Sequence, residues 1–230
     1  TSPSQPVVKI ENQQGGSNPV SIQMLRNTSS PADDDFIGQI DFRSMNDAGT
    51  PEETLYAYIT ALSTDITDGT EDGEIQFHTM KAGTLTNTLT LQSGKAGIGT
   101  NTPGGNVHVK SGESGATPSA LADELVVEGA VSTGISILTP NNQVGRLYFG
   151  DSDNNARAYV LYDHSIDTMK FSVASGNRMI INSDGNIGVG TESPTKKLEV
   201  NGSFKAASLS GSLTQLGDGT SYLIAGTNVT

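Results

Sequence analysis

The side chains that most often carry chemistry form no catalytic constellation in this sequence. The chain contains no cysteine, which excludes a thiolate nucleophile and a disulfide framework. Its histidines, His78, His108 and His164, lie on or beside separate expected strands without metal-ligand spacing, and we interpret them as solvent-facing. No Gly-x-Ser-x-Gly elbow occurs. We therefore expect no enzyme activity, no catalytic, cofactor-binding or metal-binding residue, and no cofactor.

Carboxylates gather in three loops, at residues 33–35, 65–72 and 151–153. Two acids facing each other across a groove could cleave a polysaccharide, and clustered carboxylates suit calcium. All three loops are turn-type sequences, in which aspartate commonly caps nearby backbone. The loop at 65–72 also lacks the EF-hand spacing. We therefore interpret all three as solvated turns.

A glycine-rich stretch at residues 185–194 could be mistaken for a phosphate-binding loop. Its glycines, Gly185, Gly188 and Gly190, have the wrong order for a dinucleotide fingerprint, and Pro194 follows where a helix would begin. Alternating apolar residues occur within it at 187–189 and after it at 198–200. We expect a strand, a glycine corner that turns the chain, and a second strand.

The same corner occurs earlier in the chain. Gly97 and Gly188, and likewise Pro103 and Pro194, are 91 residues apart, which marks an internal repeat. Further upstream, the segment at 37–42 matches 144–149 at an offset of 107. The second unit is thus 16 residues shorter, and we expect the loss mainly in the loop opposite 64–73.

Composition favours an all-β chain with a thin core. Of 230 residues only 34% are hydrophobic, tryptophan is absent, and 27 glycines mark many turns. Apolar strips would then be buried between chains as well as within one. The net charge of −12 argues against nucleic acid as a partner. No apolar run is long enough to span a membrane.

We expect two tandem antiparallel β repeats joined by glycine corners. The predicted organisation is a lead-in at 1–6, a first repeat at 7–112, a linker at 113–124, a second repeat at 125–202, and a connector or exchanged strand at 203–230. Expected strands of the first repeat are 7–10, 20–24, 37–42, 55–62, 74–79 and 85–91; those of the second are 125–128, 134–137, 144–149, 158–162 and 169–173. A further strand is expected at 222–225.

The repeat motif resembles that of bacteriophage tail fibres, of the kind found upstream of an endosialidase-type intramolecular chaperone domain. The motif runs from an Ile-Gly-x-Ile-x-Phe strand at 37–42 through Gly-Glu-x-x-Phe at 73–77 to the corners at 94–112 and 185–202. The resemblance implies an elongated, self-assembling homotrimer, forming a shaft segment of a virion tail fibre. The predicted buried strips are Ile40, Phe42, Phe77, Ile98, Leu147, Phe149, Phe171, Ile187, Val189, Leu198 and Val200.

Two other functions remain open from the sequence. One is a subunit of an extracellular or cell-surface head-to-tail filament, in which a terminal strand completes the next subunit's sheet. The other is a carbohydrate-binding adhesin that contacts a cell-surface glycan. Asn27, Asn201 and Asn228 begin glycosylation sequons, which chance explains in a chain so rich in Asn, Ser and Thr.

Overall fold

The chain folds into two compact units made of β-strands. The computed structural model describes residues 8–13, 15–17 and 19–207, and clustering of contacts divides the chain into Thr1–Ile135 and Ser136–Thr230. Every regular element in these described ranges is a strand, so the all-β prediction is confirmed. None of the described residues belongs to a helix that is long and apolar enough to cross a membrane.

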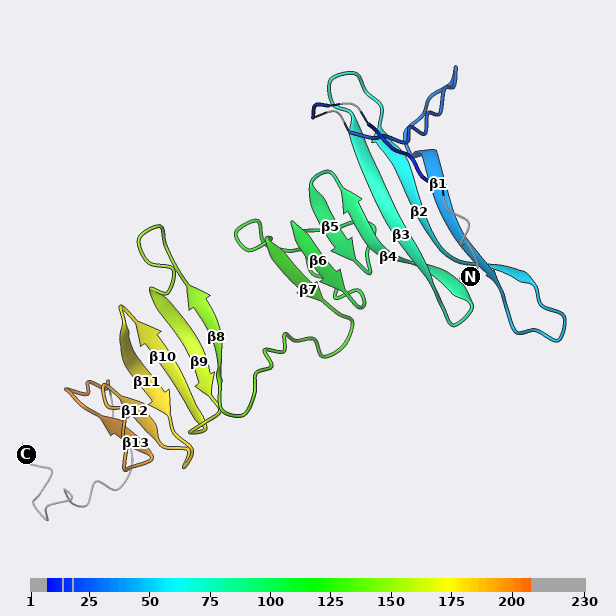
Figure 1. The fold of residues 1–230 in the computed structure, drawn as a ribbon. Coiled ribbons are helices and arrows are strands. Elements are labelled where there is room, and N and C mark those ends of the chain that lie inside the picture. The colour runs from blue at the N-terminus through cyan, green and yellow to red at the C-terminus, as the bar shows by residue number, and fades with distance from the viewer. Residues whose placement is uncertain (1–7, 14, 18, 208–230) are drawn as a thin grey trace, which may run out of the picture. The chain divides into compact units, whose positions relative to one another are not determined.

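The first unit is a seven-stranded sheet in the order β1-β2-β3-β4-β5-β6-β7 (Figure 1). The strands are β1 (Asp35–Met45), β2 (Glu53–Asp65), β3 (Asp72–Lys81), β4 (Thr84–Gln92), β5 (Lys95–Ile98), β6 (Val107–Lys110) and β7 (Leu125–Glu128). Pairing is antiparallel from β1 to β5 and parallel from β5 to β7.

The second unit is a six-stranded sheet in the order β13-β12-β11-β10-β9-β8. Its strands are β8 (Val144–Phe149), β9 (Ala158–Asp163), β10 (Thr168–Val173), β11 (Gly176–Ile181), β12 (Ile187–Val189) and β13 (Leu198–Val200). Only β12 and β13 are parallel. The predicted antiparallel repeats are thus mixed sheets, because each glycine corner returns the chain to the end where the preceding strand began.

Tight hairpins set the register of the antiparallel part. The turns at Ala82-Gly83 and Ser93-Gly94 each have two successive residues with positive φ, as a two-residue hairpin requires. Ala174 and Ser175 do the same between β10 and β11 without any glycine. We did not predict β11 from the sequence, because Ala-Ser carries no hairpin signal.

The 16 residues that the second unit lacks are not confined to one loop. The hairpin strands themselves differ, since β2 and β3 have 13 and 10 residues whereas β9 and β10 have 6 each. The expected loss opposite 64–73 is therefore only part of the difference. Shortened strands account for the rest.

The division between the units also differs from the expected one. Leu125–Glu128, expected to open the second repeat, instead pairs with β6 as β7 of the first sheet. The residues at 113–124 are thus a connection within the first unit. Val126 and Val127 lie on β7, which extends the sheet by pairing in parallel with β6, the strand that follows the glycine corner.

Four further expected strands have other outcomes. Residues 20–24 and 134–137 are not strands, although each alternates apolar and polar side chains. Residues 8–10 are likewise irregular, while Val7 and the expected strand at 222–225 lie outside the described residues.

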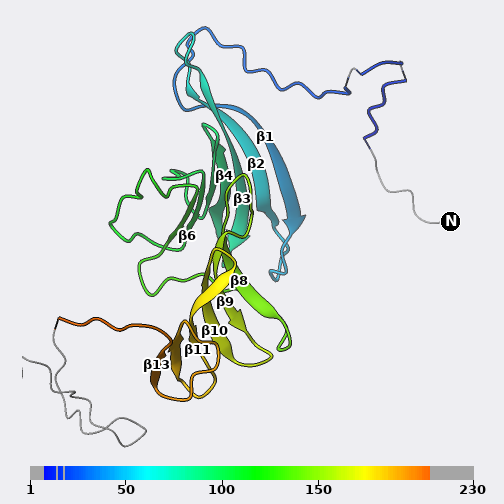
Figure 2. The same ribbon diagram turned by 90° about the vertical axis from the view of Figure 1, so that its left-hand side faces the viewer.

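Each sheet is a single layer with almost no core of its own. Among the described residues, each unit contains one sheet and no helix, and Figure 2 shows each sheet as a single layer of strands. Among the described residues, only Leu62, Leu161 and Ile180 are buried apolar side chains. A fold of this size normally buries many more, so most apolar surface remains available for contacts outside the single chain.

Candidate self-association surface

One face of the first sheet carries an unbroken row of apolar side chains. Strand register places these residues directly opposite one another on successive strands: Ile40, Ile59, Phe77, Leu89, Ile98, Val109 and Val127. Because directly opposed residues point to the same side of a sheet, the row spans all seven strands on one face.

A second row lies beside it on the same face. Its members are Gly38, Ala61, Ile75, Leu91, Ala96, Val107 and Leu125, again one from each strand. The side chains are only half-covered within the chain: Ile75 and Leu91 are each 42% exposed and Leu125 is 56% exposed. We call these two rows, together with their counterparts in the second unit, the apolar face.

The second unit repeats the pattern. Its rows are Leu147, Val160, Phe171, Met179, Val189 and Val200, and Gly145, Tyr162, Met169, Ile181, Ile187 and Leu198. Leu147 is 54% exposed and Leu198 is 57% exposed. Nine of the eleven predicted strip residues therefore lie together in these rows, while Phe42 and Phe149 lie on the same face, one position beyond the rows, opposite Ala57 and Ala158. None of the eleven is buried within the chain.

Three hollows of the described surface lie on this face. One is lined by Ile98, Val109 and Val127 and another by Ala61, Ile75 and Leu91. A third, in the second unit, is lined by Leu147, Val160 and Met169. All three are open and apolar, which suits the side chains of a partner better than a small polar ligand.

The opposite face is polar in the first unit. Thr60 and Thr90 are fully covered there, between Gln39, Gln76 and the glycine corner. Thr60 donates its hydroxyl to the Gly38 carbonyl over 3.1 Å. The two faces thus have different chemistry. The polar face suits contact with water, whereas the apolar face is exposed to water in the single chain.

The glycine corners are tightly packed at the same points in both units. A Cβ on Gly97 would lie 2.4 Å from the Thr100 carbonyl oxygen, and one on Gly188 would lie 2.4 Å from that of Thr191. Real Cβ atoms do not come that close to backbone, so these two positions require glycine. These contacts show that the backbone is close-packed at the same point of each corner.

A side chain at the start of the second corner strand caps the corner in each unit. In the first, Gly104 donates its N–H to His108 Nδ1 over 3.1 Å. In the second, Thr195 donates its N–H to Glu199 Oε2 over 2.8 Å. Gly104 and Thr195, like His108 and Glu199, are 91 residues apart, so one structural role is filled by an imidazole in one unit and a carboxylate in the other. The Thr195 N–H and hydroxyl lower the pKa of Glu199.

His108 belongs to a small buried polar cluster. Only 3% of the residue is exposed, and its Nε2 lies 3.0 Å from Glu128 Oε2, close but not aligned as a hydrogen bond. Because Nδ1 accepts from Gly104, the neutral ring carries its proton on Nε2 and presents it to the Glu128 side.

Glu128 is held in its charged form by several donors. Ser114 donates both its N–H, over 2.7 Å, and its hydroxyl, over 2.8 Å, and Lys110 Nζ lies 3.6 Å away. These contacts, those of Ser114 foremost, lower the pKa of Glu128 to about 2. The cluster ties β6 and β7 to the connection between them, so we assign it a structural role.

The lowered pKa of Glu128 predicts how the first unit responds to acid. A group whose folded pKa lies below its unfolded value adds stability above the unfolded pKa, and this is lost as pH falls toward the folded one. We expect Glu128→Gln to lower the melting temperature at neutral pH, and the gap from wild type to shrink between about pH 5 and about pH 2. Thermal unfolding monitored by circular dichroism across that range tests this. A gap independent of pH contradicts it, and Glu52→Gln, in an exposed loop, is the control.

The interpretation of the histidines as solvent-facing is wrong for His108 and incomplete for the others. His78 is half-buried, stacks on Tyr58 with ring centroids 4.2 Å apart, and lies 2.7 Å from Gln76 Oε1. His164 meets the Tyr162 ring edge-on at 4.8 Å. The histidines are less exposed than expected because the glycine corner covers His108 and tyrosine rings lie against His78 and His164.

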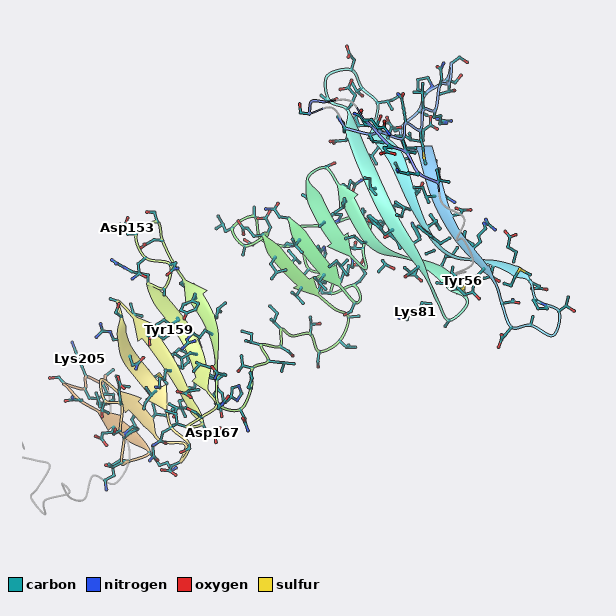
Figure 3. All side chains as sticks on the ribbon, viewed as in Figure 1. Tyr56, Lys81, Asp153, Tyr159, Asp167 and Lys205 are labelled. Carbon is teal, nitrogen blue, oxygen red and sulfur yellow. The ribbon has the colours of Figure 1, made fainter. Side chains whose placement is uncertain are left out.

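Two of the acidic loops, at 65–72 and 151–153, cap their own backbone as the sequence predicted, whereas Asp33 in the third accepts the Ile66 N–H over 3.1 Å. Asp65 accepts the Thr67 N–H over 2.8 Å, and Asp151 accepts the N–H groups of Asp153 and Asn154. Figure 3 shows Asp153 and Asp167 at opposite ends of the second sheet. Within the described part of the chain, no three His, Asp or Glu residues are arranged to hold a metal ion.

Fold and surface together define an all-β protein built from two mixed, single-layer sheets, each with an open apolar face. No family model matches the sequence, and no curated protein matches it. Among solved structures, the chain is similar to the carboxy-terminal domain of the bacteriophage T5 L-shaped tail fibre, with a TM-score of 0.43, 12% identity, and coverage of 98% of this chain and 99% of that one. It is also similar to that domain with its intramolecular chaperone domain, with a TM-score of 0.42, 11% identity, and coverage of 96% and 72%. At such TM-scores no residue role is transferred from these structures.

Proposed function

We propose that the chain is a structural protein that self-associates through its apolar face to form a segment of a fibre. The observation that carries this proposal is the pair of continuous apolar rows on each single-layer sheet, with three buried apolar side chains in all the described residues. An open apolar face of this extent destabilises an isolated domain and marks an interaction surface.

The size of the effect favours association. Covering the remaining half of an exposed Leu, Ile or Phe side chain contributes about 1 kcal/mol. Each copy offers many such side chains, among them Ile40, Leu91, Leu125, Leu147 and Leu198. Even after the entropic cost of association, the sum exceeds what a stable complex needs.

We propose a homotrimer as the arrangement of copies. Three single-layer sheets can turn their apolar faces toward one common core and leave the polar faces outside, which closes the assembly. The resemblance of the repeat motif to phage tail-fibre repeats supports this arrangement and a location in a virion tail fibre. A structural role also agrees with side chains that cap backbone rather than converge on a groove.

Sedimentation of the full chain tests the proposal. We expect a discrete species of three copies that persists on dilution, because its core lies between the copies. A stable, folded monomer would contradict the proposal, and open-ended polymers seen by electron microscopy would favour the head-to-tail filament instead. A glycan array then asks separately whether the outer face binds carbohydrate.

A further inference from the structure

The segment that precedes the first strand of each unit has the pattern of a strand but is not one. In Pro19–Leu25 the apolar residues Val20, Ile22 and Met24 alternate with polar ones, and in Gly134–Leu138 Ile135 and Ile137 do so. We call these segments arm 1 and arm 2. Alternation of this kind is typical of a half-buried strand, yet both arms are irregular in the single chain.

The backbone groups of both arms are unpaired within the described part of the chain. Among the described residues, none exchanges a backbone hydrogen bond with Val20–Leu25 or with residues 134–138. Their apolar side chains are open to solvent, with Ile22 at 73%, Leu25 at 74% and Leu138 at 89% exposure. Each arm therefore has both the side chains and the free backbone groups that a strand needs.

The arms meet their sheets at equivalent points. The Met24 sulfur lies 2.8 Å from where a Cβ of Gly38 would be, and Ile137 Cγ2 lies 3.3 Å from that of Gly145. Gly38 and Gly145 occupy matching places in the apolar rows, on the edge strands β1 and β8. Each arm thus crosses the apolar face of its own edge strand, instead of running beside it.

On the N-terminal side of arm 1, the chain leads away from the sheet, as the dark-blue trace in Figure 2 shows. Among the described residues, the outer edges of β1 and β8 have no strand partner, as is also true of β7 and β13 at the other ends of the two sheets. An open edge exposes a row of unpaired N–H and C=O groups that can template another strand. The arms lie against β1 and β8, so each unpaired segment with the pattern of a strand is close to one open edge.

The unpaired arms and open edges become important when association buries the apolar face. If copies cover that face, the arms that cross it are enclosed with it, and buried backbone groups are almost always hydrogen-bonded. We propose that each arm of one copy adds as a strand to the free edge of a neighbouring copy, arm 1 to β1 and arm 2 to β8. This inference rests on the proposed self-association and specifies its partner, a second copy, and its mode, strand addition.

Hydrogen exchange of the assembled full chain measures the pairing directly. We expect amides of both arms to exchange at least about tenfold more slowly than those of Asp47, Gly49 and Thr50, which lie in an exposed loop and whose N–H groups donate no hydrogen bond to another described residue. Exchange of the arms at the loop's rate in an intact oligomer would overturn the inference and leave the proposed function standing. A chain that forms no oligomer would overturn the proposed function itself.

Proline variants provide the second measurement. Because successive N–H groups point to opposite edges of a strand, Ser21→Pro and Ile22→Pro are made separately, and at least one should remove a bond to the neighbour. We expect that variant to dissociate at a concentration at least about tenfold higher than its control, Ser21→Ala or Ile22→Ala, which keeps the N–H. Equal dissociation of both proline variants and their controls would contradict strand addition.

Discussion

Replacement of Leu147 by aspartate is expected to convert the assembly into monomers, whereas the same replacement at the next residue is not. The two side chains are exposed to a similar degree in the single chain, 54% for Leu147 and 49% for Tyr148. They point to opposite faces of β8, because Leu147 pairs with Val160 in the apolar row and Tyr148 pairs with Tyr159.

The expected difference follows from where each charge would lie in the assembly. In a monomer both new carboxylates stay solvated and cost little. Within a shared core, a carboxylate at 147 loses its water and gains no partner, which costs several kcal/mol per copy. At 148 the loss is limited to the edge-on contact with Tyr159, roughly 0.5–1.5 kcal/mol.

Light scattering coupled to gel filtration, over a hundredfold range of concentration, distinguishes the two variants. We expect Leu147→Asp to elute as a monomer throughout and Tyr148→Asp to keep the mass of wild type. If instead Tyr148→Asp dissociates and Leu147→Asp does not, the opposite face of the second sheet is the interface. Ile40→Asp repeats the test on the first unit, where Ile40 is 48% exposed.

Substitution of the corner glycines is the second change for which we expect a large effect. In Gly97→Ala the new methyl group would lie 2.4 Å from the Thr100 carbonyl oxygen and 3.0 Å from Thr100 Cγ2. The first of these is backbone, so relief requires the corner to open. We expect a loss of about 1–3 kcal/mol or more in the free energy of unfolding, as for other overpacked sites.

Denaturant unfolding of Gly97→Ala and Gly188→Ala, beside Gly49→Ala, measures this effect. No atom lies within 4 Å of a Cβ at Gly49, so its replacement should change stability by no more than about 0.5 kcal/mol. We expect both corner variants to unfold at clearly lower denaturant concentration than Gly49→Ala. Corner variants as stable as Gly49→Ala would show that the corners are not close-packed.

Periodicity and the internal repeat predicted most of the fold. Alternation identified β1, β2, β3, β4, β8, β9 and β10, and the constant offset between Gly97 and Gly188 identified the corners. Spacing alone could not reveal that β5 and β6 are parallel, since a corner may reverse the chain or return it. The turn of Ala174 and Ser175 hid β11, because its positive φ values come from tertiary pairing and not from residue type.

The candidate surface was only partly visible from the sequence. The strips through Phe77, Ile98 and Phe171 were predicted, but Ile59, Leu89 and Val109 join them only once the register is known. His108 was missed as a buried residue because its cover, Glu128, lies on a strand that we expected in the other unit. The sequence did hold one signal for this capping role. His108 and its repeat counterpart Glu199 are different residue types that can both accept a hydrogen bond, which indicates a backbone N–H in need of an acceptor at that position.

The small core, with three buried apolar side chains among the described residues, also affects how a newly made chain folds. So small a core cannot offset the entropy lost in ordering a sheet, so one copy by itself has little driving force to fold. If copies associate as proposed, folding and assembly become a single reaction, with a rate that rises steeply with the number of copies present together. Synthesis of several copies near one another would favour the fibre, while dilute chains would wait unfolded and open to proteolysis.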